Sequence, residues 1–180
     1  MALKPTIYKI QLDLADSDRD VYQQHSLTLA RHPSETTERL TARVLAFGLY
    51  AAPGLVFTRG LSTAQEPDLW QHSASGEIEH WVELGQPEPA RLRKASGVAA
   101  RVSVLAYGKS ADTWWNQNGE AIGLLPRLRV SQLPWREVQD AAGLVTRNCA
   151  LALSIAGGMI YLDDGAQQVT LETHHLQTAQ

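Results

Sequence analysis

Hydrophobic and polar residues alternate along the first thirty positions, and a period of two is typical of half-buried β-strands. Lys9, Gln11 and Asp13 each stand between apolar or aromatic neighbours. The pattern predicts two strands, over Thr6–Ala15 and about Val21–Ala30. The polar run DSDRD between them predicts the connecting turn.

A helix is predicted after the second strand. Ser34 is a favourable N-cap residue, and the acidic Glu35 and Glu38 lie in the first turns, where the helix dipole favours negative charge. The run Ala52-Pro53-Gly54 ends this helix after about Tyr50.

The rest of the chain predicts alternating strands and helices after an irregular polar stretch. The predicted elements are a strand over Glu77–Gly85, a helix from Pro87 to about Ala100, a strand over Arg101–Tyr107, a helix beginning near Ser110, a strand over Leu128–Leu133, a helix over Pro134–Val145 and an antiparallel meander over Asn148–Leu171. Strand, helix and strand in this order favour a parallel pair. We interpret His174-His175 as part of a frayed tail. Positions 1–180 are therefore predicted to form a single α/β domain with a mixed sheet.

The composition is typical of a globular domain. The 180 residues are 44% hydrophobic and 19% charged, which supplies enough apolar material for a sizeable core. No apolar run approaches the roughly 20 residues that span a bilayer, and the amino terminus lacks the segments of a signal peptide. The single Cys149 cannot form an internal disulfide, which suits a reducing compartment. We therefore expect a cytoplasmic protein with no membrane association.

The formal net charge of -3 excludes the broad basic surface of a tight, non-specific nucleic-acid binder. Nucleic acid remains a possible partner if basic residues gather locally. Arg39 and Arg43 fall on one predicted helix, and Arg91, Arg93 and Lys94 fall on another. These residues predict a basic rim around an acidic site.

Two acidic residues form the strongest candidate for chemistry. Asp68 follows Glu66-Pro67, and Glu83 comes fifteen residues later, near the end of a predicted strand. Two carboxylates brought together by a turn and a strand would offer the oxygen ligands that Mg²⁺ prefers. The spacing alone is weak evidence, because carboxylates of this kind are solvated surface groups in most proteins.

Five runs of sequence occur in a distinctive order along positions 1–115. They are MALKPTIYKIQLDLADSDRD, LARHPSETTERLTARVLAFGL, RGLSTAQEPDLWQ, WVELGQPEPARLRKAS and YGKSADTWW. Together they resemble the YaeQ family. The resemblance implies a variant of the PD-(D/E)XK nuclease fold. This is a restriction-endonuclease-like α/β fold in which a central mixed β-sheet, flanked by helices, carries an acidic metal site.

The resemblance also implies roles for individual residues. The motif aspartate corresponds to Asp68 and the strand acid to Glu83, which would both bind magnesium. The usual motif has a lysine two residues after the second acid, but this chain has Gly85 there. Gln86 is the next residue, and Lys94 on the following helix could return an ammonium group, so both are candidate catalytic residues.

A third metal ligand often comes from the first helix of this fold, and Glu38 is the preferred candidate. It lies closer to the edge of the helix's apolar stripe than Glu35 does. The alternative remains open that both acids simply favour the helix amino terminus and pair with Arg39 or Arg43.

Two functions follow from these residues. The first hypothesis is a magnesium-dependent nuclease that hydrolyses phosphodiester bonds, with an atypical site that lacks the motif lysine. The alternative is a nuclease-like scaffold that has lost catalysis and binds nucleic acid or a protein partner. The missing lysine and the negative net charge favour the scaffold, whereas Pro67-Asp68 and Glu83 favour the enzyme.

Overall fold

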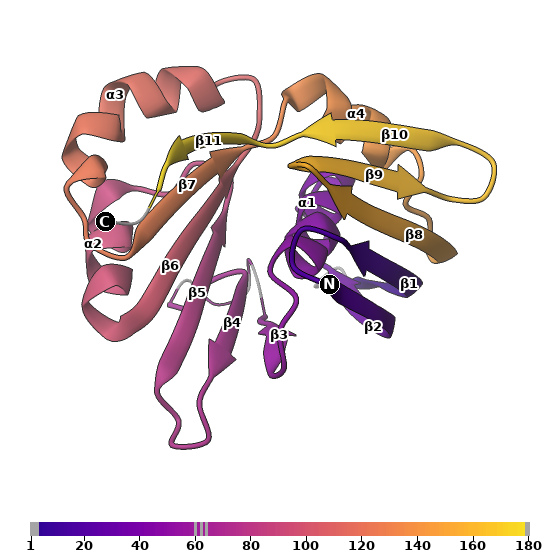
Figure 1. The fold of residues 1–180 in the computed structure, drawn as a ribbon, viewed down its shortest axis with the longest axis horizontal. Coiled ribbons are helices and arrows are strands. Elements are labelled where there is room, and N and C mark those ends of the chain that lie inside the picture. The colour runs from indigo at the N-terminus through magenta and orange to yellow at the C-terminus, as the bar shows by residue number, and fades with distance from the viewer. Residues whose placement is uncertain (1–3, 60, 62, 64, 179–180) are drawn as a thin grey trace. The chain divides into compact units, whose positions relative to one another are not determined.

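The computed structural model describes residues 4–59, 61, 63 and 65–178. The chain forms two compact units, each built around its own β-sheet (Figure 1). The first unit comprises the described residues up to Ala51 together with Arg136–Thr173. The second comprises Ala52–Trp135 and the described residues from His174 onward. The predicted α/β class is confirmed, with two mixed sheets flanked by helices where the sequence predicted one.

The sheet of the first unit has the strand order β10-β9-β8-β1-β2. Its strands are β1 (Thr6–Asp16), β2 (Val21–Arg31), β8 (Asn148–Ala156), β9 (Met159–Asp163) and β10 (Gln168–Glu172). The predicted amino-terminal hairpin and carboxyl-terminal meander are both present. β1 and β8 pair in parallel and join the hairpin to the meander. A polar-apolar alternation cannot specify this pairing, because the two strands lie far apart in sequence.

Helix α1 (Thr37–Leu49) begins later than predicted. Its N-cap is Thr36, whose hydroxyl accepts a hydrogen bond from the Arg39 backbone amide at 3.2 Å. The Ser34 hydroxyl instead contacts the Nδ1 atom of His32, 2.7 Å away. The predicted cap at Ser34 is therefore wrong, because Ser34 belongs to the turn that precedes the helix.

The sheet of the second unit has the strand order β11-β7-β6-β5-β4-β3. Its strands are β3 (Leu55–Phe57), β4 (Leu69–His72), β5 (Ile78–Leu84), β6 (Ala99–Ala106), β7 (Leu128–Gln132) and β11 (His174–Gln177). β5, β6 and β7 are parallel, and the remaining neighbours are antiparallel. The predicted parallel pair is thus confirmed.

Helices α2 (Pro89–Val98) and α3 (Ala111–Gly123) pack on one face of this second sheet (Figure 1). Trp81 and Val104 from the strands and Leu92 and Trp114 from the helices form the centre of this core. The last helix, α4 (Trp135–Ala142), spans 8 residues. Among the described residues, no helix has both the length and the apolar character needed to cross a membrane.

His174 and His175 belong to strand β11, and their interpretation as part of a frayed tail is wrong. β11 pairs with β7, with His174 opposite Gln132 and His175 opposite Ser131. The Ser131 hydroxyl lies 3.1 Å from the His175 Nδ1 atom. A four-residue strand carries too little periodicity to be recognised alone, and here its backbone hydrogen bonds come from a strand more than forty residues earlier.

Substitution by alanine should have opposite effects on stability at Gly48 and Gly97, two glycines that lie within helices. A Cβ atom at Gly48 of α1 would lie 2.0 Å from Leu153 Cδ2 in the buried face of the first sheet. We expect Gly48→Ala to destabilise the protein by about 1–2 kcal/mol, because forced rotation of Leu153 outweighs the gain in helix propensity. A Cβ atom at Gly97 of α2 would meet no described atom within 4 Å beyond its chain neighbours and its own helix backbone, so Gly97→Ala should stabilise the protein by up to about 1 kcal/mol. Urea unfolding of both variants measures the two effects, and equal effects would contradict this packing.

Candidate functional site

Asp68 and Glu83 come together at the ends of two neighbouring strands of the second unit. Leu69 of β4 pairs with Val82 of β5, so Asp68 and Glu83 stand one step beyond that pair. The Asp68 amide donates to the Val82 carbonyl at 3.0 Å, and the Leu84 amide donates to Asp68 Oδ2 at 2.8 Å. The Asp68 carboxylate is therefore fixed against the backbone of the residue that follows Glu83.

Glu83 lies on an interior strand, on the face that α2 and α3 cover. Asp68 and Glu83 are each only 4% exposed, which separates them from ordinary surface carboxylates. Glu83 Oε1 accepts two short hydrogen bonds, from Trp81 Nε1 at 2.7 Å and from Arg91 Nε at 2.6 Å. Charge-assisted hydrogen bonds of this length are strong, so the orientation of Glu83 is well defined.

Arg91 contacts the acidic pair directly, which the sequence did not indicate. It was expected in a basic rim, but its guanidinium pairs with Glu83 and donates through Nη2 to the Glu66 carbonyl at 2.6 Å. The guanidinium carbon also lies 5.9 Å from the centre of the Trp81 ring. Arg91 lies in the first turn of α2, and nothing in the spacing of Glu83 and Arg91 signals that the turn between them brings the charges together.

Burial raises the pKa of Glu83 above its usual value. The hydrogen bond from Trp81 and the charge of Arg91 act in the opposite direction, and the charge of Asp68 raises the pKa further. The negative charge of Asp68 therefore acts directly on Glu83. A cation beside both carboxylates would relieve this repulsion.

The oxygen donors suit magnesium, which binds through one or two carboxylates and retains water molecules for contact with phosphate. Glu83 Oε2 accepts no hydrogen bond within the described residues, so one carboxylate oxygen is open to a cation. No group of three or more His, Cys, Asp or Glu residues that could hold a metal occurs in the described ranges. The donor set therefore fits an ion that shares its coordination with water and substrate.

The position of the missing lysine is occupied by Gly85 in a left-handed conformation, with φ of 82°. Residues with a side chain adopt this conformation at a cost of roughly 1–2 kcal/mol, so the backbone here favours glycine. Gln86 follows, and its side-chain amide donates to the Tyr107 carbonyl at 3.2 Å and accepts from the Ser110 hydroxyl at 3.0 Å. These bonds connect the loop after β5 to the loop after β6, and the catalytic role of Gln86 stays a prediction.

Lys94 is exposed on α2, one turn after Arg91. Its ammonium group makes no ion pair or hydrogen bond with any part of the chain that the structure describes. That Lys94 supplies the ammonium group of the missing motif lysine therefore stays a prediction. In the structure the cation that reaches Glu83 from this helix is Arg91.

Glu38 and Glu35, the two candidates for a further acid, belong to the first unit. Glu38 is half-buried in the first turn of α1. Glu35 is buried before the helix and pairs with Arg43, whose Nη1 lies 3.2 Å from Glu35 Oε2. Pairing with Arg43 was one of the two alternatives for Glu35. Because Arg43 is 4% exposed, it cannot contribute to a basic rim.

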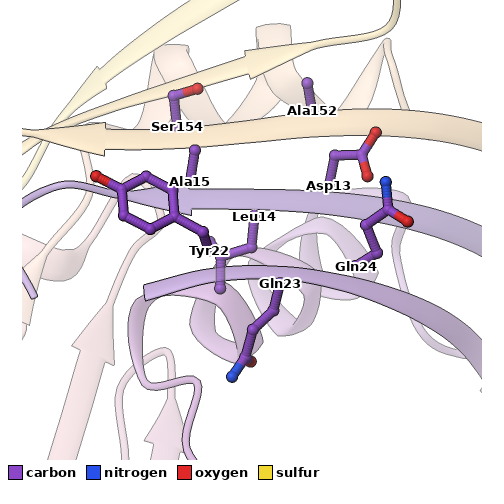
Figure 2. Close-up of a pocket in the computed structure, with 8 residues that line it drawn as sticks. All are labelled: Asp13, Leu14, Ala15, Tyr22, Gln23, Gln24, Ala152 and Ser154. Carbon is purple, nitrogen blue, oxygen red and sulfur yellow. The ribbon is translucent and has the colours of Figure 1, made fainter. Parts of the chain in front are cut away.

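A hollow of about 370 Å³ lies on the sheet of the first unit (Figure 2). Its lining comes from β1, β2 and β8 and comprises Asp13, Leu14, Ala15, Tyr22, Gln23, Gln24, Ala152 and Ser154. Figure 2 shows the Asp13 carboxylate and the Gln24 amide side by side at one end and the Tyr22 ring at the other. None of the predicted site residues lines this hollow. Asp13 is its only ionisable carboxylate, so it does not offer the paired acids of the second unit.

Comparison with known proteins identifies relatives along nearly the whole chain. A family model described as "YaeQ protein" matches residues 1–173. The chain is 41% identical over 165 residues to "Uncharacterized protein YaeQ" of Escherichia coli (strain K12), with 91% of each protein covered. It is 38% identical over 173 residues to the protein of that name from Salmonella typhi, with 96% of each covered.

Solved structures of similar proteins share this fold. The crystal structure of YaeQ from Xanthomonas axonopodis pv. citri matches with a TM-score of 0.94 and 38% identity, over 97% of this chain and 99% of that one. YaeQ from Pseudomonas syringae matches with a TM-score of 0.92 and 36% identity, over 97% of both chains. The match to the family model and the curated relatives confirm the resemblance seen in the sequence, and the chain belongs to the YaeQ family.

Proposed function

We propose that this protein is a magnesium-dependent nuclease that hydrolyses phosphodiester bonds at Asp68 and Glu83. The observation that carries the proposal is the juxtaposition of two buried carboxylates at adjacent strand ends, where burial and, to a smaller extent, the charge of Asp68 raise the pKa of Glu83. Proteins rarely bury two neighbouring acids without a cation, because each carboxylate destabilises the charged form of the other. The resemblance to the YaeQ family implies a variant of the PD-(D/E)XK nuclease fold, in which the same chemistry is expected.

Asp68 and Glu83 would hold the ion. Magnesium bound there would lower the pKa of an attacking water molecule and neutralise charge on the phosphate. The Leu84 amide and the Trp81 indole keep the two carboxylates oriented. Arg91 neutralises Glu83 in the absence of an ion. The Arg91 side chain is 31% exposed, which supports a second role in which its guanidinium would bind an incoming phosphate oxygen.

A second candidate function is a nuclease-like scaffold that binds nucleic acid or a protein without cleaving it. Two observations favour it. The left-handed Gly85 offers no side chain where the motif lysine would act, and Arg91 already neutralises Glu83. On this alternative Arg91 replaces the metal ion permanently, and the acidic pair is a structural element.

Cleavage assays distinguish the two functions. We expect purified protein with magnesium or manganese to cleave at least one of single- and double-stranded DNA and RNA. Glu83→Gln should lower the rate at least about 100-fold, because loss of a direct ligand exceeds the 10- to 100-fold effect of outer-shell partners. Glu120→Gln is the matched control, since Glu120 is an exposed acid on α3 of the same unit. Absence of cleavage of all four substrates would support the scaffold.

A further inference from the structure

Four polar residues share the face of the second sheet that lies opposite α2 and α3. On the parallel strands β5, β6 and β7, His80 pairs with Arg101 and Ser103 pairs with Arg129. Paired residues point to the same face, and residues two apart on a strand do so as well. Trp81, which packs under the helices, points to the other face. The four side chains therefore form one cluster, separate from the acidic pair.

The cluster has a buried floor and an exposed rim. His80 and Ser103 are each 4% exposed, and the His80 Nε2 atom lies 2.8 Å from the Ser103 hydroxyl. Arg101 of β6 and Arg129 of β7 are both exposed. Arg101 Nη2 donates a hydrogen bond to Gln71 Oε1 at 3.3 Å. Two guanidinium groups thus flank a fixed pair of hydrogen-bonding groups.

The positive charge of this rim is not neutralised within the unit. In the part of the chain that the structure describes, neither Arg101 nor Arg129 forms an ion pair with a carboxylate. Burial, together with the charges of Arg101 and Arg129, lowers the pKa of His80 to about 4. Single surface arginines are normally solvated, but these two act on the same buried imidazole, and an anion between them would be attracted to both.

We infer that Arg101 and Arg129, together with His80 and Ser103, form a binding site for a phosphate group. Guanidinium groups bind phosphate oxygens with two parallel hydrogen bonds, and two of them match the charge of a phosphate. When the His80 Nε2–H group donates to the Ser103 hydroxyl oxygen, the Ser103 hydroxyl can itself donate a hydrogen bond to a phosphate oxygen at the floor. The phosphate belongs either to a nucleic-acid strand or to a small phosphorylated molecule. The site lies on the other face of the sheet from Asp68 and Glu83, and the inference does not depend on the proposed nuclease activity.

Nuclear magnetic resonance of the His80 ring tests the site with inorganic phosphate as the probe. We expect phosphate to shift the ring resonances and to raise the pKa of His80, because a bound anion offsets the two nearby cations. Arg129→Gln should weaken phosphate binding by about tenfold or more, as loss of a hydrogen bond to a charged group does. Arg101→Gln provides a second variant. Arg93→Gln is the matched control, because Arg93 is an exposed arginine of the same unit on α2.

A single-stranded oligonucleotide forms the second arm of the experiment. Binding that is tighter than that of phosphate and weakens steeply with salt would support the site and identify a nucleic-acid strand as the source. Phosphate binding without tighter oligonucleotide binding would support it with a small phosphorylated molecule as the source. The inference is overturned if neither ligand changes the His80 resonances, or if Arg93→Gln weakens binding as much as Arg129→Gln does.

Discussion

Replacing Arg91 with methionine is expected to lower the free energy of unfolding by roughly 2–4 kcal/mol at neutral pH. The substitution keeps the aliphatic stem but removes the guanidinium that lies 2.6 Å from Glu83. The side chain of Glu83 is only 5% exposed, so water compensates only partly for the lost partner. The carboxylate would then remain buried next to Asp68, whose charge already opposes its ionisation.

Urea unfolding of Arg91→Met, Glu83→Gln and the double variant measures this effect. In the double variant most of the loss should be recovered, because no unpaired charge remains buried. The pH dependence has a defined sign. The pKa of Glu83 is raised on folding, so its contribution to stability is greatest at low pH and falls as pH rises from about 4.5 through the folded pKa. Arg91 lowers that pKa, so Arg91→Met should recover stability as pH falls; equal destabilisation at all pH values would contradict the buried pair.

Because of His80, the free energy of unfolding is expected to fall by about 3 kcal/mol as pH decreases from 6.5 to 4. Burial and the charges of Arg101 and Arg129 lower its pKa from 6.5 to about 4. In this interval the unfolded chain binds a proton and the folded chain does not, so acid favours unfolding. The full stability is present above pH 6.5.

The His80→Gln variant isolates this effect, because glutamine can still contact the Ser103 hydroxyl but does not titrate. At low pH Glu83 increases the free energy of unfolding, opposite to the effect of His80, so the comparison is best made in a Glu83→Gln background. Unfolding free energies at pH 7.5 and pH 4.5 should differ less for His80→Gln than for its parent, by up to about 3 kcal/mol. An unchanged difference would show that His80 does not remain neutral in the folded protein.

The sequence predicts elements well where local signals are long. The eleven-residue strand β1 alternates over its full length and β2 alternates from His25 onward, and the structure extends each prediction by one residue. β4 and β11 have only four residues each, too few for a period to be recognised. The division into two sheets depends on which strands pair, and the parallel partner of β1 lies in the last third of the chain. That pairing is set by tertiary packing and leaves no local signal.

The candidate site divides in the same way. Asp68 and Glu83 were recognisable because a motif carried them, and the pairing of β4 with β5 brings them to adjacent strand ends. The partners of Glu83 were not recognisable. Arg91 looks like any other basic residue in the run RLRK, and only the turn into α2 directs it toward Glu83 rather than toward solvent. His80 looks like one of the apolar positions of its strand, and its contact with Ser103 depends on the register of β5 and β6.

Thermal unfolding with and without magnesium tests the proposed metal site most directly, because it needs no knowledge of the substrate. At a magnesium concentration about 100 times the dissociation constant, binding to the folded state alone adds about 2.7 kcal/mol and should raise Tm by about 5–10 °C. Asp68→Asn should fold but lose this response, whereas Glu120→Gln should keep it. A wild-type Tm that is unchanged at every magnesium concentration, or a response retained in Asp68→Asn, would contradict a magnesium site at Asp68 and Glu83.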